Sequence, residues 1–418
     1  MASDPFFSIV LATYGRGRHI RPTIASVLGQ SIADFELIVV GDECNDETEE
    51  VVRAFADARI SWCNLPQNTG SQSWPNNEGI RRARGPWVCY IGHDDIWAPD
   101  HLQAIKQTSE AEGDADFVVS GCVYYGPRGS EVYSVTGLFD TPDAPFRYFF
   151  PPSSLAHRRD ITQRIGGWRD PRVIKPAVDA EFLLRAAHAG LRFVSTGRVT
   201  AHKFAAGHRY LSYLRPSSDE QDATLQALMG NPVLDLDEIV SSSKRSGQFM
   251  SDRYPDFTTV PAGWAFEQNR RNKGLNRPPL QPLGAGRVLA QTDEARALDW
   301  YALEAQHGTS FRWSGPNPRP KILIPFTGRR VRVAIEVLRM GPGRWEDLLL
   351  YVEREKVEFT RLRRAPMLDA IVADINLNSA DYTVLTLETP MFCPRDQFGG
   401  TDGRKLGIAV ADIAIEPI

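Results

Sequence analysis

Two adjacent carboxylates, Asp94 and Asp95, follow an apolar run that ends at Ile91. Strand interiors avoid Asp, and neighbouring like charges repel each other unless a cation holds them. Carboxylate oxygens are also natural ligands of Mg²⁺ and Mn²⁺, which commonly carry phosphate groups. A buried strand that ends in Gly92-His93-Asp94-Asp95 therefore predicts a site for a divalent metal and a diphosphate. The alternative is a solvated turn, with an Asp that caps a helix beginning near Pro99.

Strand and helix signals alternate through the first hundred residues, and they decide where these carboxylates lie. We expect buried strands at residues 7–12, 35–40, 60–63 and 87–91, with helices at 20–28, 51–55 and 77–83. This alternation predicts a mostly parallel sheet with helices on both faces. Ligands bind beyond the carboxyl ends of such strands. Thr13-Tyr14, Asp42 and His93-Asp94-Asp95 all fall at those ends, so we expect them to converge on one site.

The remainder of the chain changes character twice. The sheet is expected to continue at 117–120 and 193–194, around a helix at 179–189, and helical pieces at 219–228 and 264–273 follow among turn-rich segments. From residue 321 short strands recur without intervening helices, which is typical of a sandwich or jelly roll. We therefore predict an α/β domain at 1–205, a helical and irregular extension at 206–296, and an all-β domain at 297–418.

The composition limits the class of protein. The chain has 418 residues, 42% of them hydrophobic and 24% charged, and its formal net charge of −4 gives no electrostatic case for nucleic acid. Five scattered cysteines, without a CxxC pair, favour a reduced protein without zinc. The first residues do not resemble a signal peptide, and no apolar stretch approaches membrane-spanning length. We expect a cytoplasmic location, with peripheral contact to the inner face of the plasma membrane as the alternative.

A series of short motifs runs in order through the first half of the chain. They are Ser8-Ile-Val-Leu-Ala-Thr-Tyr14, residues 24–30, residues 34–42, Asn68-Thr-Gly70, Asn77 and residues 91–97, followed by Pro99 and Leu102. In this order and spacing, residues 7–204 resemble the family 2 glycosyltransferases and their GT-A fold. The resemblance implies an inverting enzyme that moves a sugar from a nucleotide-diphospho-sugar to a hydroxyl of a glycan or lipid-linked acceptor. Bacterial surface polysaccharide synthesis is the implied setting.

The resemblance assigns roles at the donor site. Thr13 and Tyr14 would border the nucleotide base, on which a tyrosine ring can stack. Asp42 would accept a hydrogen bond from a ring nitrogen of the base. Asn77 and His93 would be further nucleotide-sugar-binding residues. Tyr14 could instead pack on its own sheet, and Asp42 could be a turn residue.

The metal assignment depends mainly on one carboxylate. Asp94 matches the last acidic residue of the family's metal-binding motif, and it would hold Mg²⁺ or Mn²⁺ against the donor diphosphate. Asp95 would support it, and His202 would be a further ligand, with a place in a loop or the core as the alternative. The sequence departs from the usual motif, because Gly92 and His93 stand where the family more often has an acidic residue and a variable one.

The acceptor side carries the predicted base. Asp179 matches the Asp of the family's Glu-Asp pair, and it would remove a proton from the attacking hydroxyl. Val178 replaces the Glu, and helix capping is the alternative role for Asp179. Trp168, in Gly166-Gly-Trp-Arg-Asp170, would stack on an acceptor sugar or simply pack in the core. The C-terminal β region resembles accessory sandwich domains, which could bind glycan, form homo-oligomer contacts or cover the catalytic domain.

Two other functions are alternatives to this one. A sugar-phosphate nucleotidyltransferase needs a Gly-rich phosphate loop after the first strand, and Ala12-Thr-Tyr-Gly-Arg-Gly-Arg18 does not have that pattern. A non-catalytic glycan-binding or nucleotide-binding protein on a degenerate transferase scaffold would explain Gly41, Gly92 and Val178, which stand where relatives have acidic residues. One carboxylate survives at each of these places, which favours an enzyme.

Overall fold

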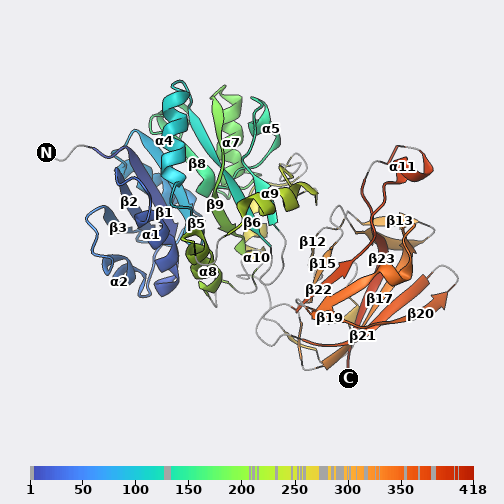
Figure 1. Ribbon diagram of the computed structural model, residues 1–418. Helices are drawn as coiled ribbons and strands as arrows, with labels where there is room; N and C mark the ends of the chain where they lie inside the picture. Colours follow the sequence, from blue (N-terminus) through green and yellow to red (C-terminus); the bar gives the residue numbers. More distant parts are fainter. Residues whose placement is uncertain are drawn as a thin grey trace. The chain divides into compact units, whose positions relative to one another are not determined.

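The computed structural model divides by contacts into two compact units, which are described separately (Figure 1). It describes the chain from residue 4 onward, except 127–132, 207–208, 210–211, 214–215, 231–233, 246–247, 252–253, 255–256, 258–259, 273–280, 284–286, 289–295, 299, 301–302, 307, 315–318, 325, 329, 353–354, 366–367, 378–382, 400 and 403. The first unit contains the elements from β1 to α10, and the second contains those from β10 onward. The three-part division of the sequence stays a prediction.

The first unit alternates strands and helices, as the sequence pattern indicates. Its elements are β1 (Phe7–Thr13), η1 (Gly17–Ile20), α1 (Arg21–Leu28), β2 (Phe35–Gly41), α2 (Thr48–Arg53), β3 (Ile60–Asn64), α3 (Ser73–Arg82), β4 (Trp87–Gly92), β5 (Ile96–Trp97), α4 (His101–Ala111), β6 (Phe117–Tyr125), β7 (Tyr133–Thr136), α5 (Ala144–Arg147), η2 (Pro152–Ser154), β8 (Leu155–Arg158), α6 (Ile161–Ile165), α7 (Val178–His188), β9 (Phe193–Phe204), α8 (Asp219–Leu228), α9 (Leu236–Arg245) and α10 (Trp264–Asn272).

One nine-stranded sheet organises this unit. Its strand order is β3-β2-β1-β4-β8-β6-β9-β5, and β7 pairs with β6. The first four strands are parallel, as predicted, whereas β8 runs antiparallel to both β4 and β6. The strands β6 and β9 are longer than the sequence pattern indicated, because they continue to Tyr125 and Phe204. The result is the mixed α/β sheet of a GT-A-like domain, in which β6 and β9 are again parallel and the antiparallel β8 separates them from the first four strands.

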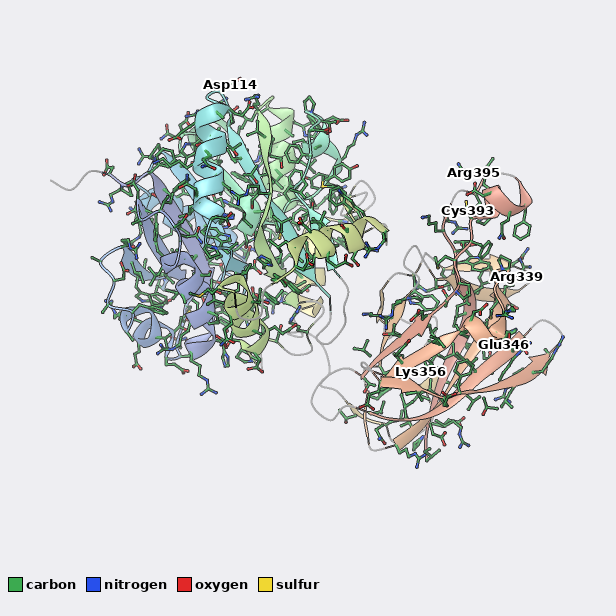
Figure 2. The ribbon with its side chains drawn as sticks, in the orientation of Figure 1. Asp114, Arg339, Glu346, Lys356, Cys393 and Arg395 are labelled. Atoms are coloured by element: carbon green, nitrogen blue, oxygen red, sulfur yellow. The ribbon has the colours of Figure 1, made fainter. Side chains whose placement is uncertain are left out.

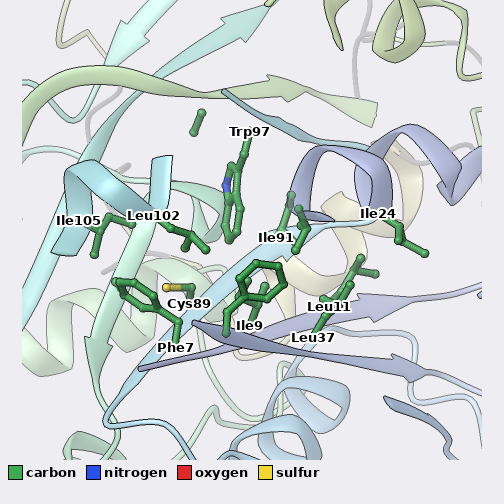
Figure 3. Packing of buried hydrophobic residues seen from close by; sticks show 14 of the residues in the cluster. Phe7, Ile9, Leu11, Ile24, Leu37, Cys89, Ile91, Trp97, Leu102 and Ile105 are labelled. Atoms are coloured by element: carbon green, nitrogen blue, oxygen red, sulfur yellow. The ribbon is translucent and has the colours of Figure 1, made fainter. Parts of the chain in front are cut away.

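Both faces of the sheet are buried. Phe7, Ile9 and Leu11 of β1 lie in one hydrophobic cluster with residues of α1 and α4, as Figure 3 shows. Val10 of the same strand lies in a second cluster on the other face, together with Phe182 of α7. Successive side chains of a strand point to opposite faces, so a strand buried on both faces appears as a continuous apolar run. This burial fixes the strand ends that carry the predicted site.

The second unit is an antiparallel β sandwich. Its elements are β10 (Gln281–Pro282), β11 (Arg287–Val288), β12 (Arg296–Leu298), β13 (Glu304–Gln306), β14 (Thr309–Trp313), β15 (Lys321–Ile324), β16 (Phe326–Thr327), β17 (Arg330–Met340), η4 (Trp345–Asp347), β18 (Leu349–Val352), β19 (Glu355–Val357), β20 (Thr360–Ala365), β21 (Leu368–Asn376), β22 (Thr383–Glu388), α11 (Pro394–Phe398) and β23 (Ile408–Pro417).

Two sheets supply the core of this sandwich. The seven-stranded sheet has the order β13-β14-β23-β17-β21-β20, with β11 beside β23, and the five-stranded sheet has the order β12-β15-β22-β18-β19. Alternate residues of β17, including Val333 and Ile335, pack against Ile322 and Leu385 of the other sheet. The predicted all-β architecture is therefore confirmed. Among the described residues β22 starts at Thr383, and most of the turn-rich segment 314–320 that precedes the strands lies outside the described residues.

The exposed parts of the sandwich carry its polar side chains. A cavity of about 720 Å³ lies over the outer face of the seven-stranded sheet, and Arg332, Glu336 and Asp374 are among the residues that line it.

Cys393, which is labelled in Figure 2, directly precedes α11. The five cysteines all lie in the described part of the chain, and none of them forms a disulfide bond. Among the described residues, no helix is both long enough and apolar enough to cross a membrane.

Candidate active site

Three of the predicted positions meet at one edge of the sheet. In the register of the parallel strands Thr13 pairs with Gly41, and Ala12 pairs with Gly92. The segments that leave β1, β2 and β4 therefore start side by side, and the Asp42 amide donates a hydrogen bond of 2.8 Å to the Thr13 carbonyl. The structure thus brings the predicted metal–diphosphate residues next to the predicted base-binding residues.

Asp42 is buried and organises a neighbouring loop. Its Oδ1 accepts hydrogen bonds from the Thr69 amide (2.9 Å) and hydroxyl (2.8 Å), and its Oδ2 accepts one from the Gly70 amide (3.1 Å). Tyr14 is 42% exposed on the adjacent loop. The carboxylate fixes the Asn68–Gly70 motif first, and any contact with a base would be additional.

Gly41 and Gly92 occupy positions where a larger residue does not fit. A Cβ at Gly41 would lie 2.4 Å from Asn64 Oδ1, and a Cβ at Gly92 would lie 2.6 Å from Asp95 Oδ2. Both distances are shorter than a side chain tolerates. The departures from the family pattern at these glycines therefore have a local steric cause.

Asp94 and Asp95 have different surroundings, although they are adjacent. The side chain of Asp94 is 21% exposed, and its Oδ2 lies 3.0 Å from Nη2 of Arg16. Asp95 is fully buried, and its carboxylate accepts hydrogen bonds from the Ser153 hydroxyl (2.5 Å), Lys203 Nζ (3.1 Å) and the Phe204 amide (3.2 Å). Asp95 thus joins the end of β4 to β9, and its carboxylate is fully buried among these partners.

Burial and mutual attraction have opposite effects on the pKa values of Asp95 and Lys203. Burial raises the pKa of the Asp95 carboxyl, and the Lys203 ammonium acts against that rise. Burial would lower the pKa of Lys203, but the charges of Asp95 and Asp94 raise it above its ordinary value. Removing either partner would leave a buried charge without compensation. This pair stabilises the strand end, and no local sequence pattern predicts it because the partners are far apart in the chain.

The predicted metal ligands do not form a dedicated metal site. Among the described residues, no group of three or more His, Cys, Asp or Glu side chains could hold a metal ion. His202 is fully buried, with Nδ1 3.1 Å from the Tyr125 hydroxyl, and burial lowers its pKa to about 4. His93 lies beside the Asp94 carboxylate, with Nε2 4.0 Å from Oδ2. Of the two adjacent carboxylates, Asp94 is the one whose side chain is partly exposed.

Asn77 and Trp168 lie within the protein and bind each other. The Asn77 amide group accepts a hydrogen bond from the Trp168 amide and donates one to its carbonyl, both 2.8 Å long. The indole is only 4% exposed, stacks on Phe182 at 4.8 Å and donates to the Tyr90 hydroxyl at 3.1 Å. The prediction that Trp168 stacks on an acceptor sugar is therefore wrong for this structure, because its ring faces are covered. Asn77 positions the 166–168 backbone.

Asp179 lies in the first turn of α7, as predicted. Its Oδ1 accepts a hydrogen bond of 2.9 Å from the Ala180 amide, and its side chain is partly exposed. The preceding Val178 belongs to the same hydrophobic cluster as Tyr90 of β4, the strand that leads to Asp94. The start of α7 and the end of β4 are thus tied to one core, and Asp179 is rigidly placed.

Several residues near these positions were missed at the sequence level. Arg185 pairs with Glu181 and donates to the carbonyls of Gly166 and Gly167, so it holds the same loop as Asn77. Tyr254, from the segment before α10, is influenced by Asp179: burial first, and then the Asp179 charge, raise the pKa of its hydroxyl. Tertiary contacts bring these residues together, and no local sequence pattern predicts these contacts.

Comparisons with known proteins find relatives of part of the first unit. Residues 8–161 match the family model for Glycosyl transferase family 2. An uncharacterized glycosyltransferase of Nostoc sp. is 27% identical over 172 residues, which cover 38% of this chain and 52% of that protein. A poly(ribitol-phosphate) beta-N-acetylglucosaminyltransferase of Staphylococcus aureus is 28% identical over 126 residues, covering 29% and 37%.

Other relatives cover similar parts. A UDP-Glc:alpha-D-GlcNAc-diphosphoundecaprenol beta-1,3-glucosyltransferase of Escherichia coli is 31% identical over 100 residues, or 24% of this chain and 39% of that protein. The chain thus spans about half, or less, of the length of these relatives. Residues 1–349 of S. aureus TarS, solved with UDP-GlcNAc, align at a TM-score of 0.41 and 17% identity, over 56% of this chain and 69% of that one. Residues 8–161 are thus similar to the family 2 glycosyltransferases, and the relatives of this part of the chain include enzymes of bacterial polysaccharide synthesis.

Proposed function

We propose that this protein is an inverting glycosyltransferase, which moves a sugar from a nucleotide-diphospho-sugar to a hydroxyl of a glycan or lipid-linked acceptor. The observation that carries the proposal is the convergence of Thr13, Asp42 and Asp94 at the carboxyl ends of three adjacent strands. Ligands of open α/β sheets bind at such an edge. Bacterial surface polysaccharide synthesis is the proposed setting, in keeping with the relatives.

The chemistry proposed for Asp179 is proton removal. As the acceptor hydroxyl attacks the anomeric carbon, the carboxylate takes its proton, and the bond from that carbon to the diphosphate oxygen breaks on the opposite face. Such in-line displacement inverts the anomeric carbon. The position of Asp179 in the first turn of α7 gives the carboxylate a fixed direction, which a general base needs.

A divalent cation fits this site only in company with the donor. Mg²⁺ is commonly bound through one or two carboxylates together with substrate phosphates, so Asp94 alone can serve as the protein ligand. His202 stays a proposal, because its ring is buried beside Tyr125. When bound, the cation would neutralise negative charge on the leaving nucleoside diphosphate.

The proposal is tested first by binding and then by turnover. Isothermal titration with UDP, GDP and dTDP, each with MnCl₂, should identify at least one ligand, and the corresponding nucleotide-sugars should then be consumed. Asp179→Asn should lower turnover by about 10²–10⁴-fold and leave nucleotide affinity unchanged, because the carboxylate acts only in proton transfer. Asp237→Asn, an exposed carboxylate on α9, is the matched control. Full turnover in Asp179→Asn would remove the base assignment.

The same assays address the non-catalytic alternative. A binding protein on a degenerate scaffold would bind nucleotide or glycan but neither transfer nor hydrolyse the donor. NMR of the product would give the configuration of the anomeric carbon, and retention would contradict the inverting mechanism.

A further inference from the structure

Arg16 lies beside Asp94 at the carboxyl ends of the parallel strands, where the donor is proposed to bind. It is not among the predicted site residues. It follows β1 between Gly15 and Gly17, whose φ angles of +52° and +47° favour glycine. This turn directs the guanidinium inward, where only 4% of the residue is exposed. The local backbone thus places a buried cation beside Asp94.

The guanidinium is held from several sides. Its Nη2 donates to Asp94 Oδ2 at 3.0 Å, and its Nη1 donates to the Ser212 carbonyl at 2.7 Å. Its Cζ lies 4.4 Å from the centre of the Tyr213 ring. A guanidinium on an aromatic face is stabilised by the ring quadrupole. Arg16 is therefore a fixed element of the site rather than a solvated surface residue.

The Nε donor of this side chain has no acceptor in the described part of the chain. The Nε atom of Arg16 is buried and has no hydrogen-bond partner among the described residues, and the same holds for the hydroxyl of Thr13, three residues earlier. A buried donor without an acceptor is unfavourable, so a ligand that supplies an acceptor oxygen gains affinity. The planar set of donors of arginine matches phosphate oxygens particularly well. Both orphan groups lie at the strand end where the diphosphate is proposed to bind.

The charges around Asp94 are balanced by two basic side chains. Asp94 and Asp95 carry two negative charges, and Arg16 and Lys203 compensate them through the pairs of 3.0 and 3.1 Å. A free divalent cation would have to displace Arg16 from Asp94, and a free diphosphate would meet the Asp94 charge. A cation and a diphosphate that arrive together can each take one partner of the existing pair.

We propose that Arg16 is a ligand of the donor's diphosphate, and that it releases Asp94 to the divalent cation when the donor binds. The free protein then keeps Asp94 neutralised by its own arginine, and cation and nucleotide bind as a pair. This inference rests on the proposed function, because it requires a nucleoside-diphosphate donor at this edge.

The test measures the two affinities separately. Free Mn²⁺, followed by electron paramagnetic resonance, gives the affinity for the cation alone, and calorimetry with UDP, GDP or dTDP plus MnCl₂ gives the affinity for the pair. In Arg16→Ala the affinity for Mn²⁺ alone should rise about tenfold, because its competitor is gone. The affinity for the nucleotide with Mn²⁺ should fall about ten- to a hundredfold, the effect of one hydrogen bond to a charged group.

Two further variants make the result specific. Arg18→Ala removes an exposed arginine from the same loop and should leave both affinities as in the wild type. Arg16→Lys keeps the charge without the planar donors, so it should lose nucleotide affinity about tenfold while Mn²⁺ alone still binds as weakly as to the wild type. This lysine variant carries the test if the alanine variant does not fold.

The possible failures can be told apart. If the wild type binds a nucleoside diphosphate and Arg16→Ala changes neither affinity, the role of Arg16 is refuted while the proposed function stands. If the wild type binds none of the three nucleotides with MnCl₂, the donor site itself is refuted, and the inference falls with it.

Discussion

The indole of Trp168 belongs to a hydrogen-bonded chain inside the first unit. It donates to the Tyr90 hydroxyl, which lies 2.7 Å from Nε2 of His157, and Nδ1 of that ring lies 2.8 Å from the Arg158 carbonyl. The carbonyl accepts only, so Nδ1 carries the proton, and the Tyr90 hydroxyl donates to Nε2. The Arg158 carbonyl thus fixes the tautomer of His157, and with it the direction of the hydrogen bond from Tyr90.

Replacing Trp168 tests this structural role. Trp168→Phe keeps an aromatic ring against Phe182 but removes the donor to Tyr90, so we expect the free energy of unfolding to fall by about 1–3 kcal/mol. Urea denaturation measures the change, with Trp264→Phe, at a residue 37% exposed, as the control. Unchanged stability together with a raised acceptor KM would instead support the sugar-stacking role that the sequence suggested.

Restoring the family's acidic residue at Gly92 should harm the protein. The new Cβ of Gly92→Asp would crowd Asp95 Oδ2 and add a third carboxylate beside Asp94, so we expect a lower melting temperature and no gain in Mn²⁺ affinity. Gly113→Asp is the matched control, since a Cβ at Gly113 meets nothing within 4 Å. A stable Gly92→Asp with tighter Mn²⁺ binding would mean that the site tolerates the usual motif.

At the scale of elements, α3 and α7 together hold the loop between α6 and α7. Asn77 of α3 binds both backbone groups of Trp168, and Arg185 of α7 binds the carbonyls of Gly166 and Gly167. The family resemblance places this loop on the acceptor side. Loosening it should therefore affect the acceptor more than the donor.

Asn77→Ala tests that separation. The change leaves one amide and one carbonyl of Trp168 without partners, so the loop should lose its fixed position. We expect a higher acceptor KM or a lower kcat of about tenfold, while calorimetric donor affinity stays within about twofold. Asn376→Ala, on an exposed part of β21, serves as the control. A loss of donor affinity equal to the loss of turnover would show that Asn77 acts on the nucleotide directly.

The elements themselves were largely predictable, and their partners were not. The apolar runs gave β1, β2 and β4 because both faces of these strands are buried, and helical periodicity gave α8 at the observed residues. The strand β8 was missed, since its four residues include His157 and Arg158 and show no apolar run. Asp94 could be singled out from its position after a strand. Its pairing with Arg16 depends on tertiary structure, and so does the use of Asp95 by Lys203, 108 residues away.

At the scale of the whole molecule, the two units have separate hydrophobic cores. A chain with two cores need not unfold in a single step, so two calorimetric transitions are expected. The units also differ in buried histidines. Burial lowers the pKa of His101 to about 3 and the pKa values of His157 and His202 to about 4, and all three belong to the first unit.

Mild acid should therefore destabilise the first unit selectively. Below pH 6.5 the unfolded state binds protons that these folded histidines refuse, so stability is fully present above that pH. It is lost as the pH falls towards 4, by up to about 1.4 kcal/mol per histidine and pH unit. The described carboxylates of the second unit with lowered pKa values, Asp347, Asp374 and Asp402, stay ionised at pH 5.5.

Calorimetry at pH 7.5 and 5.5 should thus show a lower temperature for the transition of the first unit and an unchanged one for the second. Hydrogen exchange, corrected for intrinsic rates, should assign the moving transition to peptides of β6 and β9 rather than β17 and β21. Equal shifts of both transitions would show that buried histidines do not dominate the acid response.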